Sequence, residues 1–239
     1  MNNDLPKAIL FDLDDTILAL SESADPTWRN ICRKVAPRVD GQTPEGLFEA
    51  IEATRNWFWA DADRHRSGRL NLRNARREIV SRAFRQLRID DPDLVTEVSD
   101  AYTSAREDAV APFPGAIETL RTLGDKGVRL GMITNGTAEG QRRKINKFGL
   151  SDFFQYILVE GEFGVGKPDE RVYLQALRKL GVAPTDTWMA GDNLEWDVEA
   201  PQRLGIYAIW VDFEGKGLPE STHVVPDRIV THISQILEP

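Results

Sequence analysis

Residues 8–16 read Ala-Ile-Leu-Phe-Asp-Leu-Asp-Asp-Thr, an apolar run followed at once by carboxylates at Asp12 and Asp14. A short apolar run of this kind is typical of a buried parallel strand. Because open α/β sheets bind ligands beyond the carboxyl ends of their strands, Asp12 and Asp14 are expected near a binding site. Two crowded carboxylates repel each other unless a cation or a shared proton relieves them. The sequence therefore indicates a metal site or an acid–base pair near residue 12.

Apolar runs that end in polar residues recur along the chain. Further strands are expected at residues 130–133, 156–159, 187–190 and 206–211, with a weaker one at 228–230. Helices are expected between them, notably at residues 115–123 and 169–180. The second of these helices should bury one face made of Val172, Tyr173, Ala176, Leu177 and Leu180. Strands that alternate with helices predict an α/β fold, a doubly wound parallel sheet with helices on both faces.

One long stretch interrupts this alternation. Between residues 17 and 110, apolar residues recur at helical spacing and no convincing strand is found. A Pro-Phe-Pro-Gly sequence at residues 112–115 marks the return to the sheet. We therefore expect an α/β core domain of residues 1–16 and 111–239. A helical domain of residues 17–110 would be inserted after the first strand.

Composition and charge exclude several classes of protein. The 239 residues carry a net charge of −8, which argues against a general partner of nucleic acid or of anionic membranes. No run of about 20 apolar residues exists, and the first residues lack the basic and apolar regions of a signal peptide. Cys32, the single cysteine, falls in a helical apolar pattern and is expected in the core. These features predict a cytoplasmic protein, either a monomer or a homodimer.

Polar residues follow the predicted strands at one edge of the sheet. Thr134 and Asn135 follow one strand, Asp192 follows another, and Lys167 lies in the loop after a third. A hydroxyl, free backbone N–H groups and a lysine suit an anion of the size of phosphate. Asp12 and Asp192 can share a hard cation such as Mg²⁺, which prefers oxygen ligands. Each group alone could be a turn, cap or solvated residue, but their common position after strands indicates a site.

Four short segments, taken in order, resemble the motifs of the haloacid dehalogenase-like (HAD) hydrolase superfamily. They are Asp12-Leu13-Asp14-Asp15-Thr16, Thr134-Asn135, Lys167 in Gly166-Lys167-Pro168-Asp169, and the GDxxxxD stretch from Gly191-Asp192 to Asp197. The helical insertion after the first segment is similar to that of the helical-cap (C1) members. The resemblance covers nearly the whole chain. It implies a Rossmann-like core with an α-helical cap.

The resemblance also implies an activity, that of a Mg²⁺-dependent phosphatase acting on a small phosphorylated metabolite through a phosphoaspartyl intermediate. Asp12 would be the nucleophile, and Asp14 would act as general acid and then as general base. Asp14 separates this chemistry from that of the dehalogenases in the family, whose halide leaving group needs no proton.

The other matching residues take their roles from the same resemblance. The catalytic Lys167, the Thr134 side chain and the Asn135 backbone would hold the phosphoryl oxygens. The Asp12 side chain, the Asp14 backbone carbonyl and Asp192 would be the Mg²⁺ ligands. Asp197 would orient Lys167 or a metal-bound water. Pro201, further along, disfavours the interior of a long helix.

Several alternatives stay open at this point. A phosphomutase would use the same site and return the phosphoryl group to its substrate. A phosphate-binding regulatory protein would keep the fold without turnover. Residues 161–167 also match the GxxxxGK part of a P-loop, but Pro168 stands where that motif needs Ser or Thr, so an NTPase is disfavoured.

The inserted domain holds an arginine cluster. Nine of the residues from 64 to 88 are arginines, and Glu78 is the one acidic residue among them. These arginines form either a solvated face or a surface that binds a second anionic group of the substrate. Arg64, Arg66 and Arg69 are the better candidates because a loop is expected beside them at residues 67–68. No motif in this domain names the substrate.

Overall fold

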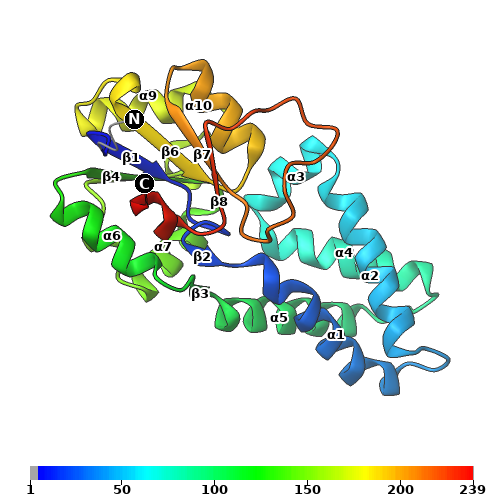
Figure 1. Ribbon diagram of the computed structural model, residues 1–239. Helices are drawn as coiled ribbons and strands as arrows, with labels where there is room; N and C mark the ends of the chain where they lie inside the picture. The colour runs from blue at the N-terminus through cyan, green and yellow to red at the C-terminus, as the bar shows by residue number, and fades with distance from the viewer. Residues whose placement is uncertain (1–4, 239) are drawn as a thin grey trace. The chain divides into compact units, whose positions relative to one another are not determined.

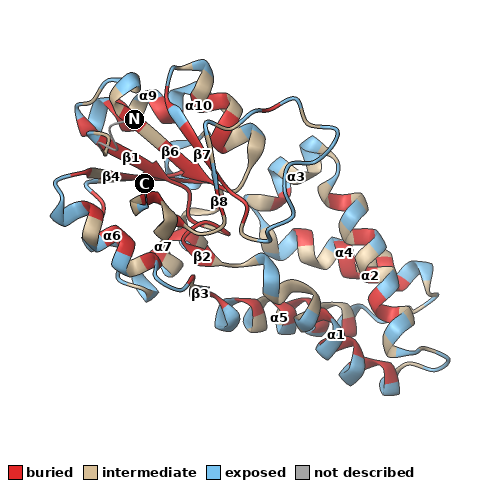
Figure 2. Cartoon of the chain, viewed as in Figure 1, coloured by how far each residue is buried: buried red, intermediate tan, exposed pale blue. Residues whose placement is uncertain are grey.

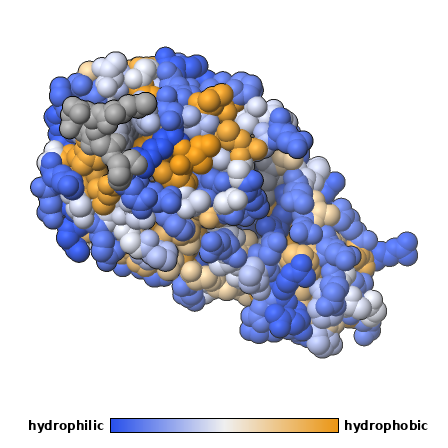
Figure 3. Space-filling model, in the orientation of Figure 1, coloured by the Kyte–Doolittle hydropathy of each residue, from blue (hydrophilic) through white to orange (hydrophobic). Residues whose placement is uncertain are grey.

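The structure is a computed structural model that describes residues 5–238. The chain divides into two compact units. The core unit comprises Met1–Ala19 and Ala111–Pro239, and the helical unit comprises Leu20–Val110. Within residues 5–238, no helix is both long and apolar enough to cross a membrane. The surface seen in Figure 3 is mostly hydrophilic, as expected from the 28% of charged residues.

A six-stranded parallel sheet forms the centre of the core unit (Figure 1). In sheet order its strands are β5 (Tyr156–Val159), β4 (Arg129–Thr134), β1 (Ala8–Phe11), β6 (Thr187–Gly191), β7 (Tyr207–Val211) and β8 (Arg228–Val230). All four residues of β1 are buried, as expected for a central strand covered on both faces. Chain order runs outward from β1 through β4 to β5, and in the other direction from β6 to β8. The order therefore reverses between β1 and β6.

Helices cover both faces of this sheet, which confirms the predicted fold class. Helices α6 (Ala116–Asp125) and α7 (Ala138–Lys147) lie on one face, and α9 (Glu170–Leu180) and α10 (Ala200–Arg203) lie on the other (Figure 1). The short α8 (Glu160–Phe163) follows β5 directly. The buried face of α9 packs against β1, β4, β5 and β6 and consists of the predicted residues, Val172, Tyr173, Ala176, Leu177 and Leu180.

The helical unit consists of five α-helices. They are α1 (Ala24–Val35), α2 (Pro44–Trp59), α3 (Ala62–Arg69), α4 (Leu72–Gln86) and α5 (Pro92–Ala109). Apolar residues from α1, α2, α4 and α5 form a core of their own, which Figure 2 shows as buried stripes along these helices. In this core the rings of Trp28 and Tyr102 stack with centroids 3.8 Å apart. The unit therefore has its own hydrophobic centre.

Side-chain caps explain where several of these helices begin. Thr43, Asp61, Asn71 and Asp91 each accept a hydrogen bond from the backbone N–H three residues ahead, at the starts of α2, α3, α4 and α5. A cap of this kind satisfies one of the orphan donors of a first helical turn. Three of these four helices are also visible in the sequence as apolar periodicity, whereas α3 is not.

The prediction of a loop at residues 67–68 is wrong, because Ser67 and Gly68 lie inside α3. Gly68 is the single buried residue of this helix, so no apolar stripe marks it in the sequence. A Cβ on Gly68 would lie 2.6 Å from the Phe58 ring, which explains why glycine fits there. Arg64, Arg66 and Arg69 are therefore helical residues.

The two chain segments that flank the inserted helical unit pair with each other through their backbones. Strand β2 (Leu18–Ala19) runs antiparallel to β3 (Ala111–Pro112), and Ala19 pairs with Ala111. The helical unit accordingly begins at Leu20, whereas the sequence reading placed the boundary at residue 17.

Pro201 lies in the first turn of the short α10, a position where helices tolerate proline. Before α10, Leu194–Glu199 forms one π-helical stretch.

Candidate active site

The polar residues singled out in the sequence meet where the strand order reverses. Asp12 directly follows β1, Thr134 ends β4, and Asp192 directly follows β6. Because β1 pairs with both β4 and β6, the ends of these three strands are neighbours. In open α/β sheets, this edge at a reversal of strand order is where ligands bind.

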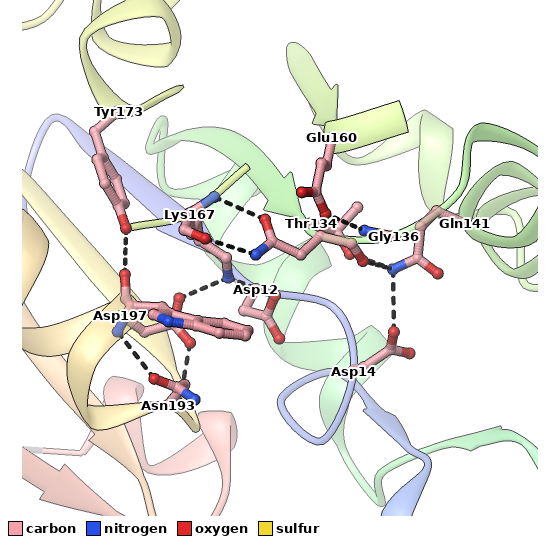
Figure 4. Close-up of polar contacts among 12 residues, drawn as sticks. Asp12, Asp14, Thr134, Gly136, Gln141, Glu160, Lys167, Tyr173, Asn193 and Asp197 are labelled. Carbon is pink, nitrogen blue, oxygen red and sulfur yellow. Dashed lines mark hydrogen bonds and ion pairs between the residues drawn. The ribbon is translucent and has the colours of Figure 1, made fainter. Parts of the chain in front are cut away.

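Lys167 is the buried centre of this group. Its Nζ lies 2.6 Å from Asp12 Oδ1 and 2.6 Å from Asp197 Oδ1 (Figure 4). The lysine is only 1% exposed, and a charge at that depth needs such partners. Although burial lowers the pKa of Lys167, the two carboxylates outweigh it and raise the pKa above its ordinary value. Lys167 is therefore held as an ammonium against Asp12.

Burial opposes the ionisation of Asp12 and Asp192. Burial raises the pKa of Asp12 to about 7, against the opposing effect of Lys167. Burial also raises the pKa of Asp192 well above its ordinary value, and the nearby charges of Asp12 and Asp197 raise it further. One ammonium is thus too little positive charge for a cluster of three carboxylates, of which Asp12 and Asp197 are buried. A bound cation would relieve this imbalance.

The donor set matches a hard divalent cation. One carboxylate oxygen each from Asp12, Asp192 and Asp197 can lie within 4.8 Å of one another. Asp197 already receives Lys167 on one oxygen and the Asn193 N–H on the other, at 3.1 Å. Among residues 5–238, by contrast, no donor hydrogen-bonds the Asp192 carboxylate. Asp12 and Asp192 are therefore the better candidates to bind a metal ion, and an all-oxygen set suits Mg²⁺.

Two hydrogen bonds join the Thr134–Asn135 loop to the lysine loop. The Asn135 side chain donates to the Lys167 carbonyl and accepts from the Lys167 N–H, both at 2.8 Å. A Cβ on the neighbouring Gly166 would lie 2.5 Å from Asn135 Oδ1, so only glycine permits this approach. Next to Asn135, the Gly136 N–H donates to the buried Glu160 carboxylate at 2.9 Å. The Asn135 side chain is thus structural, which leaves its backbone for a ligand.

Asp14 has different partners from Asp12. Its carboxylate accepts from Lys144 Nζ at 2.6 Å and from Gln141 Nε2 at 3.0 Å, both on α7, and Figure 4 shows the contact with Gln141. The same Gln141 amide donates to Thr134 Oγ1 and, at 2.9 Å, to the Asn135 carbonyl. The two carboxylates therefore lie in one site but in separate environments.

Gln141, Lys144 and Glu160 were missed in the sequence. Glutamine and lysine three residues apart on a helix look like an ordinary solvated face. The one available signal is Thr137, which caps α7 and so fixes where the helix starts relative to Thr134. Among the predicted residues, the structure brings Asp12, Lys167 and Asp192 together, with Thr134, Asn135 and Asp14 around them.

Asp197 is positioned by the segment that follows β6. Asn193 begins this segment by accepting hydrogen bonds from the N–H groups of Glu195 and Trp196. The Asp197 N–H then donates to the Asn193 carbonyl at 2.7 Å. A Cβ at Gly191 would collide with the Asp197 carboxylate, so glycine ends β6. Asp197 is consequently aimed at Lys167.

Comparisons with known proteins agree with this geometry. The family model described as haloacid dehalogenase-like hydrolase matches residues 6–205. A phosphoserine phosphatase from Thermus thermophilus is 30% identical, with 96% of this chain and 97% of that protein covered. A glyceraldehyde 3-phosphate phosphatase from Methanopyrus kandleri is 27% identical, over 97% of this chain and 96% of that protein.

A solved structure gives the same result for the fold. The HAD-hydrolase YfnB from Bacillus subtilis, solved with bound magnesium, superposes with a TM-score of 0.74 at 18% identity. The comparison covers 98% of this chain and 97% of that protein. At this identity, the likeness supports the α/β fold alone.

Proposed function

The chain belongs to the haloacid dehalogenase-like hydrolase family, and on that basis we propose that it is a Mg²⁺-dependent phosphomonoesterase. In this proposal Asp12 forms the phosphoaspartyl intermediate and Asp14 handles the protons. The substrate is a small phosphorylated metabolite in the cytoplasm. The membership itself confirms the resemblance seen in the sequence motifs.

The observation that carries the proposal is the separation of the two carboxylates. Asp12 is ion-paired with buried Lys167 (Figure 4), whereas Asp14 is bound by Lys144 and Gln141. Two carboxylates in different environments can take different roles in one reaction. A halide leaving group would give the second carboxylate nothing to protonate. Hydrolysis of a phosphate ester requires both groups.

The reaction proceeds in two displacements. Asp12 attacks the phosphorus, the ester bond breaks, and Asp14 gives its proton to the leaving alcohol. Asp14 then takes a proton from water, which attacks the phosphoaspartate and releases inorganic phosphate, so that Asp12 is regenerated. When bound by Asp12, Asp192 and the Asp14 carbonyl, Mg²⁺ supplies positive charge between the nucleophile and the phosphate.

Three groups would hold the phosphoryl oxygens during both displacements. They are the Thr134 hydroxyl, the Asn135 backbone N–H and the Lys167 ammonium, which already contacts Asp12. Their contribution is positioning and charge stabilisation, which phosphoryl transfer needs most. Asp197 fixes the Lys167 ammonium through the 2.6 Å contact.

The similar proteins suggest which phosphate esters to test first. Two of these proteins are named for the phosphate esters glyceraldehyde 3-phosphate and phosphoserine. Both compounds are small esters of a primary alcohol. We propose a substrate of this class for this chain. Whether the enzyme is a monomer or a homodimer does not enter the mechanism.

A phosphate-release screen over such esters, with Mg²⁺ and with EDTA, tests the proposal. We expect release for some esters, dependence on Mg²⁺, and its loss in Asp12→Asn, which has nearly the same shape. Full activity in Asp12→Asn would contradict the mechanism. Isomerised product without free phosphate would indicate the phosphomutase instead, and tight binding without turnover would indicate a regulatory protein.

A further inference from the structure

Helix α7 presents two side chains to the active site that none of the four motifs contains. Gln141 and Lys144 are three residues apart and so lie on the same face of the helix. Both contact the carboxylate of Asp14, more than a hundred residues away in the chain. Gln141 is 4% exposed, and the Lys144 and Asp14 side chains are 18% and 23% exposed. These contacts are too well shielded to count as an ordinary surface ion pair.

Gln141 connects the acid–base residue to the phosphate-binding loop. Its amide nitrogen lies within hydrogen-bond distance of Asp14 Oδ2, Thr134 Oγ1 and the Asn135 carbonyl, which share its two hydrogens (Figure 4). Because the acceptors share one donor atom, Asp14 and Thr134 lie within two hydrogen-bond lengths of each other. A threonine hydroxyl that accepts from Gln141 keeps its own proton to donate to a phosphoryl oxygen. The Gln141 amide therefore orients both the Thr134 hydroxyl, as a donor, and the Asp14 carboxylate, as an acceptor.

Lys144 restrains the other side of the Asp14 carboxylate. Its ammonium lies 2.6 Å from Oδ1 and 2.5 Å from Oδ2. Together with Gln141, this contact leaves the carboxylate little freedom to turn about its side-chain torsions. A group that transfers a proton must lie within hydrogen-bond reach of the reacting oxygen, so a small misplacement lowers the rate.

We propose that Gln141 and Lys144 are positioning residues that hold Asp14 for proton transfer to the leaving alcohol. This inference rests on the proposed phosphatase function. Lys144 itself transfers no proton: the leaving oxygen receives its proton from Asp14, and Asp14 recovers one from water.

The leaving group provides the test. A primary alkyl phosphate needs a proton on its leaving oxygen, whereas p-nitrophenyl phosphate releases a stable anion that does not. For Lys144→Met we expect kcat/KM to fall about 10- to 100-fold on an alkyl phosphate, a part of the roughly 10²–10⁴-fold that general acid–base catalysis supplies. On p-nitrophenyl phosphate kcat/KM should stay within about threefold. Lys144→Arg, which keeps a cationic donor, should restore most of the loss.

Two further variants separate positioning from a structural effect. Lys147→Met removes the same charge from the same helix, where Lys147 lies over the Phe148 ring, and should leave both substrates unaffected. In an Asp14→Asn background, Lys144→Met should add little further loss, because its effect passes through Asp14.

The opposite results would overturn the inference. Equal losses on both substrates, no loss on either, or additive losses with Asp14→Asn would each show that Lys144 does not act through Asp14. Such results would leave the phosphatase assignment intact if the wild type still depends on Asp12. A wild type without any phosphate release would overturn both together.

Discussion

At the scale of the residue, Lys167 is the most unusual side chain of the molecule, a lysine as buried as the apolar core around it. Its position follows from two carboxylates, since Asp12 and Asp197 each lie 2.6 Å from its Nζ. The sequence could place Lys167 in a loop near Asp12, because both follow strands. It could not show the burial, which depends on how Asn135 and Gly166 bring the loop inward.

Replacing Lys167 by methionine should unfold the metal-free protein more readily. The change keeps the volume but leaves Asp12 and Asp197 buried without their counter-charge. Removing one partner of a buried ion pair typically costs about 3–5 kcal/mol of the free energy of unfolding. Urea denaturation in EDTA measures this cost, with exposed Lys7→Met as the matched control. A midpoint equal to that of the wild type would show that the pair contributes nothing to stability.

Cys32 should behave as an inert thiol whose ionisation is linked to folding. Burial raises its pKa from 9.0 to about 11. Because the folded state resists losing the proton, its contribution to stability is complete below pH 9 and is lost as the pH rises towards 11. The loss amounts to about 1.4 kcal/mol for each unit of pKa shift.

Two measurements check the behaviour of Cys32. The native protein should react with iodoacetamide at pH 8 only as fast as it unfolds, and Cys32→Ala should weaken the fall in stability between pH 9 and 11. Rapid alkylation of the folded protein at pH 8 would contradict the burial of the thiol.

At the scale of the element, strands were predictable and two helices were not. The strands β1, β5 and β8 coincide with the predicted runs. The signal is clearest for β1, because a parallel strand covered on both faces is apolar throughout. Helix α3 has one buried residue, a glycine, and therefore no periodic signal. Helix α7 buries only Gln141 and Ile145, so its role in holding Asp14 is invisible in a hydrophobic pattern.

The loop that carries Lys167 should not tolerate an added methyl group at Gly166. In Gly166→Ala the new Cβ would lie 2.5 Å from Asn135 Oδ1 and 2.6 Å from Glu160 Cδ. The loop must then move away from Asn135 and take Lys167 with it. We expect kcat/KM to fall about 100-fold, as a 1 Å misplacement can cause.

Gly124→Ala is the matched control for this loop. Gly124 lies near the end of α6 with nothing within 4 Å of an added Cβ. Alanine there should leave activity unchanged and raise the free energy of unfolding by about 0.5–1 kcal/mol, since glycine is the poorer helix former. Equal activity of the two variants would mean that the loop is not held by the Asn135 contact.

At the scale of the whole molecule, each unit has its own core, and every residue taken from the four motifs belongs to one unit. The apolar cluster around Trp28 lies entirely within Leu20–Val110. Asp12, Asp14, Thr134, Lys167 and Asp192 all belong to the other unit. The sequence showed this division because one helical stretch interrupts an otherwise regular alternation of strands and helices. The substrate preference was not readable, since no motif in the helical unit encodes it.

The pairing of Ala19 with Ala111 allows the two units to be separated experimentally. Since β2 and β3 are antiparallel neighbours at this pair, an Asn-Gly turn can replace residues 20–110 and close a two-residue hairpin. The shortened chain keeps the sheet, its covering helices and the groups that would bind Mg²⁺ and phosphate. We expect it to unfold cooperatively and to hydrolyse p-nitrophenyl phosphate.

The shortened chain should lose its preference among metabolite esters although it still hydrolyses p-nitrophenyl phosphate. If the helical unit sets specificity, kcat/KM values for the best and the worst metabolite esters should converge, while Mg²⁺ dependence and the need for Asp12 persist. Circular dichroism first establishes that the shortened chain is folded, and a phosphate-release screen then compares the spread of rates with that of the full chain. A folded but inactive chain would show that the helical unit supplies a residue to the chemistry. An unchanged order of preference would show that the core alone selects the substrate.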